Sequence, residues 1–379
     1  MLQRRVLIAA GAAATAAPWL GARAADRWLI GQSAPATGVL APSSAETTAG
    51  ARLFFERINA RGGIHGKPLE LVSLDDGQDA KRTAENTARL LADGAHLLAL
   101  YRTTPSISAA LPLAQKAGCA FVGAQVGPTL LYEPVLPEVF NTRSRYHDEA
   151  ARAVNFFALL GIRRVAALVA TDAFGKDVMA GLVPALDAAG AQLVAQASID
   201  NRVADISQQL AQLKRAAPQV VILVSNAKAA AGFVVASKAE GFNATFVSLS
   251  NTSSASYVQD LGRAAEGVVV TQVVPSPHSG RLRAVAAYRA ALAEGAQAGT
   301  PGLPPLSHAS LQGWLTARFI TELVRRAGPG ASRERIVEAS SPSASFELGD
   351  FPLSYSARSR QGSRLAELTV IGRDGRFMY

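Results

Sequence analysis

The stretch RINARGGIHGKPLELVSLDDGQD, residues 57–79, decides how this chain is organised. It reads as the end of a helix, the pair Gly62-Gly63 that would stop it, a turn, an apolar strand and an abrupt acidic break. Nothing in it is suited to nucleophilic or redox chemistry. We therefore interpret it as a helix–strand corner of an α/β sheet, and its purpose has to be sought in the sequence around it.

The same alternation of short apolar segments and longer helical segments continues along the chain. Strands are expected at residues 27–35, 67–74, 95–100, 120–124, 163–170, 191–199, 219–225, 244–250 and 266–275. Helices are expected over residues 43–63, 79–94, 103–118, 147–160, 174–190, 205–218, 227–241 and 307–327. Strands separated by helices predict βαβ units and parallel sheets buried on both faces. The number of strands is too high for one sheet of ordinary size, so we expect an α/β fold of two Rossmann-like lobes.

Two of these helices carry more detailed expectations. The helix after the quoted stretch should face inward through Ala84, Ala88 and Leu91. The helix after the third strand should have Thr104 as its N-cap residue, and Pro112 should bend or shorten it.

The N-terminus has the layout of an export signal. Arg4 and Arg5 precede an apolar, alanine-rich segment, and Ala24 ends a small-residue cleavage site that would leave Ala25 as the first mature residue. Export could use the Sec route or, from the arginine pair, the twin-arginine (Tat) route. A buried N-terminal helix or an uncleaved anchor is the alternative. Removal of residues 1–24 takes away three arginines and no acid, and lowers the formal charge from +9 to +6.

Signatures of catalysis and of cofactors are missing from the sequence. There is no G-x-S-x-G elbow, no Walker loop, no H-E-x-x-H, and no G-x-G-x-x-G after the first strand. The histidines are isolated from one another, and the single cysteine, Cys119, is expected to be a buried structural thiol. Basic residues are scattered without interleaved aromatic residues. We expect no enzymatic activity, no cofactor, no metal site and no nucleic-acid partner.

One segment suggests recognition of an anion. Open parallel sheets bind ligands outside the carboxyl ends of their strands, and LLALYRTTPSIS, residues 97–108, reads as strand, loop and helix start. Free N–H groups at a helix N-terminus favour an anion, and the hydroxyls of Thr103, Thr104 and Ser106 add donors. This geometry would suit one carboxylate. An ordinary helix cap is the alternative interpretation.

Together these features resemble the periplasmic substrate-binding proteins of branched-chain amino acid ABC importers, the leucine/isoleucine/valine-binding protein family. AGARLFFERINARGGIHGKPLELVSLDDGQDAKRTAENTARLLADG, residues 49–94, is very similar to the family's most recognisable block. LIGQSAPATG (29–38) looks like its opening strand and ligand loop. EVFNTRSRYHDEAARAV (138–154) and VATDAFGKDV (169–178) look like the crossing into the second lobe and that lobe's first ligand loop. AEGVVVTQVVPSP (265–277) looks like the return crossing, so the resemblance covers essentially the whole mature chain.

The resemblance implies a type I periplasmic binding fold with three inter-lobe crossings and a hinge that closes the lobes over a ligand. Lobe 1 would comprise residues 25–143 and 275–364, and lobe 2 residues 144–274 and 365–379. It also implies a protein without catalysis that resides in the periplasm. Such a protein delivers its ligand to the permease and ATPase subunits of an inner-membrane ABC importer.

The resemblance further implies a ligand site, which we transfer position by position. The expected set is Tyr101, Arg102, Thr103, Thr104, Ser106, Ala124, Gln125, Arg145, Tyr146, Phe174 and Asn251. Three places depart from the family pattern. The loop GAQVGP (123–128) has Gln125 and Gly127 where the family often has a serine or threonine, which leaves mainly the backbone donors of Ala124 and Gln125. Phe174 stands where tyrosine is common, and Asn251 falls near the acid that amino-acid binders often place against the ammonium group. Without a carboxylate there, a closed cleft would bury an unpaired ammonium at high cost.

Arg102 and Arg145 lie in or near the expected ligand loops. Both could point to solvent, as arginines usually do, but an inward guanidinium would favour an organic acid over a zwitterion. The expected function is capture of a small carboxylate-bearing solute, an amino acid or an organic or aromatic acid, for an ABC importer. The alternative is a ligand-sensing periplasmic protein of the same fold that reports to a signalling partner. A secreted hydrolase is disfavoured by the missing nucleophile elbow.

Overall fold

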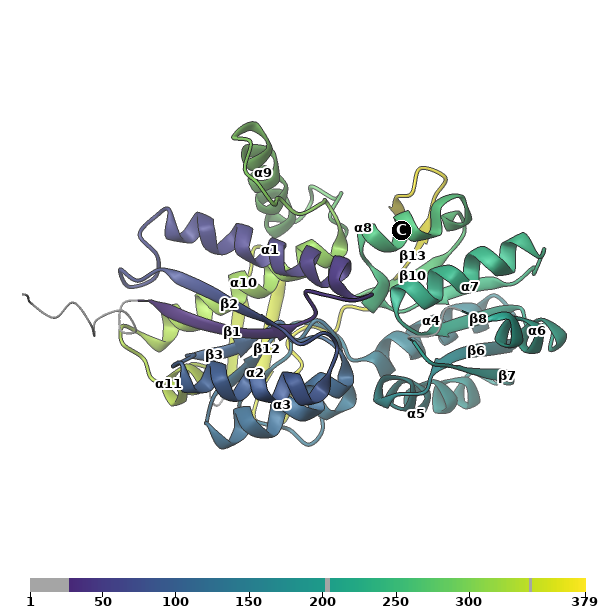
Figure 1. The fold of residues 1–379 in the computed structure, drawn as a ribbon, viewed down its shortest axis with the longest axis horizontal. Coiled ribbons are helices and arrows are strands. Elements are labelled where there is room, and N and C mark those ends of the chain that lie inside the picture. Colours follow the sequence, from purple (N-terminus) through teal and green to yellow (C-terminus); the bar gives the residue numbers. More distant parts are fainter. Residues whose placement is uncertain (1–26, 202–204, 341–342) are drawn as a thin grey trace, which may run out of the picture.

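Two sheets, each covered by helices on both faces, form the framework of the molecule (Figure 1). The structure is a computed structural model, and it describes residues 27–201, 205–340 and 343–379. The expected export signal lies outside the described residues. Within them, no helix combines the length and the apolar character needed to cross a membrane. We call the unit around the first sheet lobe 1 and the unit around the second sheet lobe 2.

Lobe 1 is built on a parallel sheet with the strand order β2-β1-β3-β4-β5. Its strands are β1 Trp28–Ala34, β2 Leu69–Asp75, β3 Leu97–Ala99, β4 Ala120–Val122 and β5 Val139–Phe140. Every residue of β1, β3 and β4 is buried, as expected for a sheet packed on both sides. The strand order reverses its direction between β1 and β3, and this is where open α/β sheets form their ligand crevice.

Lobe 2 is built on a larger sheet with the order β14-β13-β10-β9-β8-β6-β7. Its strands are β6 Arg164–Ala170, β7 Gln192–Ile199, β8 Val220–Val224, β9 Thr245–Ser248, β10 Val269–Gln272, β13 Glu367–Ile371 and β14 Phe377–Met378. Strands β6 to β10 are parallel, as expected from their βαβ connections. The C-terminal strands β13 and β14 join the sheet edge as an antiparallel pair.

Helices cover both faces of each sheet. They are α1 Ala41–Asn59, α2 Ala80–Ala92, α3 Thr104–Lys116, α4 Tyr146–Leu159, α5 Ala173–Ala188, α6 Ser207–Arg215, α7 Ala227–Ala239, α8 Ala255–Leu261, α9 Arg283–Gln297, α10 His308–Ala327 and α11 Arg333–Glu338. In lobe 1, α1 and α10 pack on one face and α2 and α3 on the other. In lobe 2, α4 and α5 cover one face, and α6, α7 and α8 the other. A hairpin of β11 (Ser343–Glu347) and β12 (Pro352–Ser356) closes the side of lobe 1.

The quoted stretch folds as the expected corner between α1 and β2. The turn contains Gly62 and Gly63 at φ values of 92° and 71°, a region that favours glycine. A Cβ atom on Gly63 would lie 2.1 Å from the carbonyl oxygen of Lys67, so the chain could not close the turn with any other residue.

The acidic segment at the end of β2 and directly after it, residues 75–79, forms hydrogen bonds with the loop after β1 and with the start of α2. Asp75 accepts hydrogen bonds from the Thr37 hydroxyl (2.7 Å) and from the backbone N–H of Gly77 (2.9 Å). Partial burial acts to raise the pKa of Asp75, but the hydrogen bonds outweigh it and lower that pKa to about 2. Asp79 accepts from the N–H of Arg82 at 2.8 Å and caps α2. These acids therefore shape the loop that follows β2.

The inward face of α2 is centred one position earlier than expected, although Leu91 packs against the core as expected. Its buried residues are Thr83, Thr87 and Leu90, whereas Ala88 is exposed. Threonines were not expected inside, but their hydroxyls find buried partners: the hydroxyl of Thr87 lies 2.9 Å from that of Tyr101.

The cap expected for α3 is also wrong by one position. Helix α3 begins at Thr104, and its N-cap is Thr103, whose Oγ1 accepts a hydrogen bond of 3.2 Å from the N–H of Ser106. The helix continues through the exposed Pro112 to Lys116, so this proline does not shorten it.

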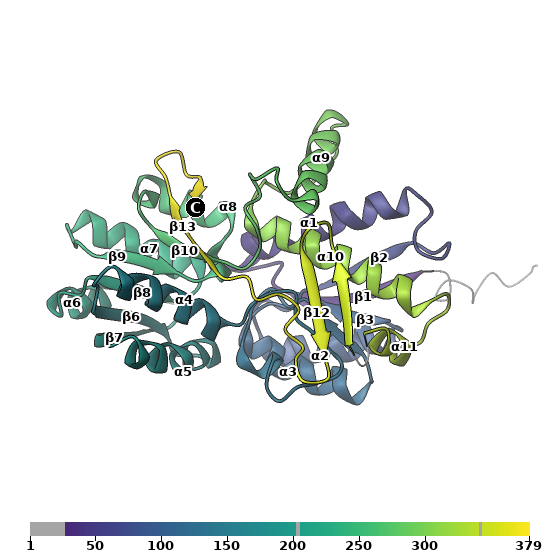
Figure 2. The ribbon, with the colours of Figure 1, turned by 180° about the vertical axis from the view of Figure 1, so that it is seen from behind.

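The chain passes between the lobes three times: between β5 and α4, between β10 and α9, and between β12 and β13. Figure 2 shows the last passage as the yellow segment that leads from the hairpin into β13. A fully buried ion pair of Arg143 and Glu149 lies at the first passage. Glu149 also accepts a hydrogen bond from the N–H of Ser250 at 2.9 Å and one from the hydroxyl of Thr271. Hydrogen bonds thus hold the connecting segments together at the hinge.

Candidate functional site

A cavity of about 400 Å³ lies between the lobes, where strands of both sheets end. Its walls come from the segments that directly follow β2, β3, β6, β7, β8 and β9. This is the crevice that the topology of open parallel sheets predicts. The lining residues are Leu40, Gly77, Gln78, Asp79, Ala80, Arg102, Thr103, Thr104, Pro105, Val126, Tyr146, Thr171, Asp172, Phe174, Asp200, Asn201, Asn226 and Asn251.

Arg102 is the only arginine in this lining, and its side chain is buried within the wall of lobe 1. It donates hydrogen bonds to Oε1 of Gln125 (2.9 Å) and Oγ of Ser43 (2.9 Å). It also donates to the carbonyl oxygen of Asn251 (3.0 Å), which belongs to lobe 2. Burial lowers the pKa of Arg102 to about 10, so the guanidinium is still cationic at neutral pH.

The N-terminus of α3 lies beside this arginine. Thr103 has a φ of 58°, which is uncommon for a residue other than glycine and is often found at functional sites. Thr104 lines the cavity, and its buried Oγ1 has no hydrogen-bond partner among the described residues. Backbone N–H groups in the first turn of a helix favour a negative charge. Arg102 and α3 therefore give lobe 1 an anion-binding character.

Lobe 2 contributes an aromatic pair and several acceptors. The ring centroids of Tyr146 and Phe174 are 4.9 Å apart, and both side chains are buried. Asp172 accepts hydrogen bonds from the N–H groups of Phe174 (3.0 Å) and Gly175 (3.2 Å) and so caps α5. Oδ1 of Asn251 is buried without a hydrogen-bond partner in the described part of the chain.

Six of the residues expected at the ligand line this cavity: Arg102, Thr103, Thr104, Tyr146, Phe174 and Asn251. Four others are buried in lobe 1 outside the lining: Tyr101, Ser106, Ala124 and Gln125. The polar side chains among them form hydrogen bonds within the protein. The hydroxyl of Ser106, for example, accepts a hydrogen bond from Thr83 at 2.9 Å.

Arg145 was the second arginine whose direction the sequence left open. It lies outside the cleft cavity and forms ion pairs with Glu133 (2.8 Å) and Asp148 (2.9 Å). The hydrogen bond with Asp148 raises the pKa of Arg145. Its charge is therefore balanced at the surface, unlike that of Arg102.

Sequence reasoning did not include three acids that line the cavity in the expected ligand set: Asp79, Asp172 and Asp200. The loops that hold the first two, residues 75–79 and 169–178, were already expected near the ligand, whereas Asp200 was not singled out. Each follows a strand by a few residues, and this position was the signal that could have identified them. The resemblance implied an ammonium partner only near Asn251. The carboxylates instead come from loops after β2, β6 and β7.

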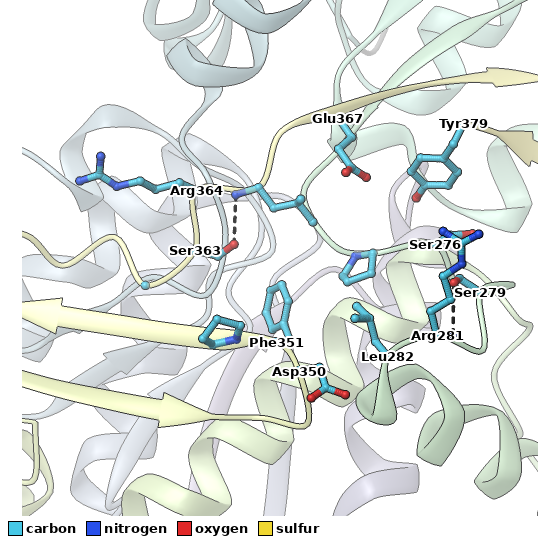
Figure 3. Close-up of a pocket in the computed structure, with 14 residues that line it drawn as sticks. Ser276, Ser279, Arg281, Leu282, Asp350, Phe351, Ser363, Arg364, Glu367 and Tyr379 are labelled. Carbon is cyan, nitrogen blue, oxygen red and sulfur yellow. Dashed lines mark hydrogen bonds between the residues drawn. The ribbon is translucent and has the colours of Figure 1, made fainter.

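A second, larger cavity of about 710 Å³ lies at the hinge (Figure 3). It is bordered by the segment after β10 and by the segment that enters β13, and it shares no lining residue with the cleft cavity. Its apolar wall includes Leu282 and Phe351, and its charged residues include Arg281, Arg364 and Glu367. In Figure 3 the side chain of Arg364 points away from the other labelled residues. We take the smaller cavity as the ligand site because it gathers the segments after six strands of the two sheets, whereas the larger cavity borders the segment after only one of these parallel strands, β10.

The comparison with protein families gives a match over almost the entire described chain. The sequence profile of the periplasmic binding protein family matches residues 28–376. The leucine-, isoleucine-, valine-, threonine- and alanine-binding protein of Pseudomonas aeruginosa is 23% identical over 249 residues, which cover 65% of this chain and 67% of that protein.

Solved structures agree with this match. A substrate-binding periplasmic protein of Ralstonia solanacearum has 27% identity and a TM-score of 0.86, covering 92% of this chain and 99% of its own. A possible leucine/isoleucine/valine-binding protein of Rhodopirellula baltica has 26% identity and a TM-score of 0.86, covering 94% and 97%. The two-lobed architecture is thus the type I periplasmic binding fold that the sequence predicted. The chain belongs to the periplasmic binding protein family.

Proposed function

We propose that this protein captures a small solute bearing a carboxylate between its lobes and delivers it to an ABC importer. The proposal rests on the position and the unpaired charge of Arg102. Its buried guanidinium lines the cleft and, in the described part of the chain, forms no ion pair. A buried cation without a counter-ion is costly, and a bound carboxylate would remove that cost.

The N-terminus of α3 supports the same reading. Its first turn and the unpartnered hydroxyl of Thr104 lie in the same wall as Arg102. A carboxylate there would accept hydrogen bonds from the guanidinium, from the hydroxyl and from backbone N–H groups. Charge-assisted bonds of this kind are about twice as strong as neutral ones.

Two acids of the lining keep an amine within the proposal. Asp79 and Asp172 belong to the lining, and an ammonium group would find carboxylates there. We therefore retain both an amino acid and an organic or aromatic acid as ligands. The aromatic pair Tyr146 and Phe174 would contact the body of either.

The partners and the location follow from the family. A member of this family would bind its solute in the periplasm after removal of an export signal near Ala25. It would then dock on the permease of an inner-membrane importer driven by ATPase subunits. Hinge closure would use the three connecting segments described above.

The test is a thermal-shift screen of the protein that begins at Ala25. The panel holds leucine, phenylalanine, their deaminated 2-oxo acids, benzoate and succinate. A ligand that binds only the folded state raises the melting temperature by mass action. Calorimetry with the best acid should then show at least about 30-fold weaker binding for Arg102→Met, because a charge-assisted pair is lost.

Arg145→Met is the matched control, since Arg145 is paired outside the cavity. It should bind the acid as the unaltered protein does. The proposal fails if no member of the panel shifts the melting temperature, or if Arg102→Met binds the acid normally.

A further inference from the structure

The guanidinium of Arg102 donates its hydrogen bonds within the protein to neutral oxygen atoms. Its acceptors are Oε1 of Gln125, Oγ of Ser43 and the carbonyl oxygen of Asn251, at 2.9, 2.9 and 3.0 Å. Ser43 and Gln125 belong to lobe 1, so that lobe alone can orient the guanidinium. The bond to Asn251 forms only where the two lobes meet.

Gln125 is itself held in one orientation. Its Nε2 donates to the carbonyl oxygen of Leu100 at 2.8 Å, which turns Oε1 towards Arg102. Its backbone oxygen accepts a hydrogen bond of 2.7 Å from Arg143, and its side chain is 1% exposed. Gln125 therefore stands between two buried guanidinium groups without lining the cavity.

The two buried arginines, Arg143 and Arg102, differ in whether a carboxylate of the protein pairs with their charge. Arg143 pairs with the carboxylate of Glu149, so its charge is balanced inside the protein. Arg102 has an amide, a hydroxyl and a carbonyl where such a carboxylate would stand. Glu46 is the acid whose charge acts on Arg102, but its carboxylate already accepts from the N–H groups of Ala255 and Ser256.

We infer that Gln125 and Ser43 are positioning residues that hold Arg102 in the cleft wall and leave its charge for the ligand. This inference rests on the proposed function and assigns Gln125 a role other than ligand contact. The choice of an amide over a carboxylate at position 125 then determines specificity. A carboxylate there would neutralise Arg102 and compete with an acidic ligand.

The test compares Gln125→Glu with the unaltered protein. The introduced carboxylate loses the hydrogen bond to the carbonyl oxygen of Leu100 but should pair with Arg102. In chemical denaturation without ligand, Gln125→Glu should therefore be more stable than Gln125→Met, which loses the same bond and supplies no counter-ion. Binding of the acid with the largest shift in the panel should weaken at least about 30-fold in calorimetry. The primary amide of that acid, which lacks the charge, should lose less. A merely structural residue would not move stability and affinity in opposite directions.

Two further variants keep the inference testable if Gln125→Glu does not fold. Gln125→Met and Ser43→Ala each remove one neutral acceptor, and each should weaken acid binding by about 3- to 10-fold. Gln115→Glu makes the same charge change on an exposed face of α3 and should bind normally.

The outcomes separate the two claims. Loss of binding in Arg102→Met together with normal binding in Gln125→Glu and Gln125→Met would overturn the inference and leave the proposed function intact. Failure of the unaltered protein to bind any acid in the panel would overturn the proposed function itself.

Discussion

Glu46 of lobe 1 accepts a hydrogen bond of 2.9 Å from the backbone N–H of Ala255 in lobe 2. Its other carboxylate oxygen accepts from Ser256 at 2.9 Å, so the carboxylate spans the first turn of α8. Ser307 adds a hydroxyl donor at 2.8 Å. One buried side chain of α1 thus connects the two lobes beside the cleft.

Glu46→Gln should loosen this connection. The amide retains one acceptor oxygen but turns an NH₂ group towards a backbone N–H and removes the negative charge at the helix start. We expect a loss of about 1–2 kcal/mol in the free energy of unfolding and weaker ligand binding. Chemical denaturation and calorimetry would measure both. Glu56→Gln, on the exposed face of the same helix, is the control, and equal effects of the two substitutions would contradict this role.

From the burial of His308 we predict how the free energy of unfolding depends on pH. It is fully buried at the start of α10, its Nε2 lies 2.8 Å from the hydroxyl of Tyr379, and its ring packs edge-on against Phe377. Burial lowers the pKa of His308 to about 3, and the charge of His278 acts in the same direction. The unfolded chain therefore binds a proton more readily than the folded protein. The contribution of His308 is complete above its ordinary value of 6.5 and is lost as the pH falls towards 3.

The measurement is the free energy of unfolding across the acidic range. His308 should contribute a decrease of about 1.4 kcal/mol per pH unit below its unfolded pKa. His308→Gln keeps a hydrogen-bonding group for Tyr379 but does not titrate, so its curve should be flatter by that amount. Parallel curves for the two proteins would show that His308 is not responsible.

Gly313 marks the crossing of α1 and α10 in the core of lobe 1. A Cβ atom on it would lie 1.8 Å from the carbonyl oxygen of Thr47, so the two backbones touch. Gly313→Ala should lower the free energy of unfolding by at least about 2 kcal/mol through overpacking. Gly232→Ala, on α7 with no atom within 4 Å of the added Cβ, should instead stabilise by about 0.5–1 kcal/mol. Denaturation curves in which both variants lose stability equally would refute the close contact.

Local sequence patterns located most of the framework. The apolar runs at residues 219–225 and 244–250 contain β8 and β9, because strands buried on both faces are continuously apolar. The long helix at residues 307–327 contains α10, with Ser307 as its cap. The patterns did not single out β5, α8, α9, α11 or the hairpin of β11 and β12.

The errors at α2 and α3 have different physical causes. Thr83 and Thr87 are buried because hydroxyls from other segments satisfy them, and no periodicity of apolar residues can show that. Thr103 is the cap of α3 at a φ of 58°, a conformation that residue type does not reveal for threonine. Tertiary partners decided the first case, and the backbone conformation at Thr103 decided the second.

The sequence by itself determined the alternation of strands and helices, hence two parallel sheets and the loops at their carboxyl ends. These properties depend on near neighbours in the chain. Only the tertiary structure decided that Arg102 enters the cleft wall while Arg145 stays outside it. The partners of Arg102, Ser43 and Asn251, are 59 and 149 positions away along the chain, and folding alone brings them together. The direction of a long charged side chain depends on the acceptors that surround it in space. For Arg102, the folding of lobe 1 supplies Ser43 and Gln125, and the meeting of the two lobes adds the carbonyl oxygen of Asn251.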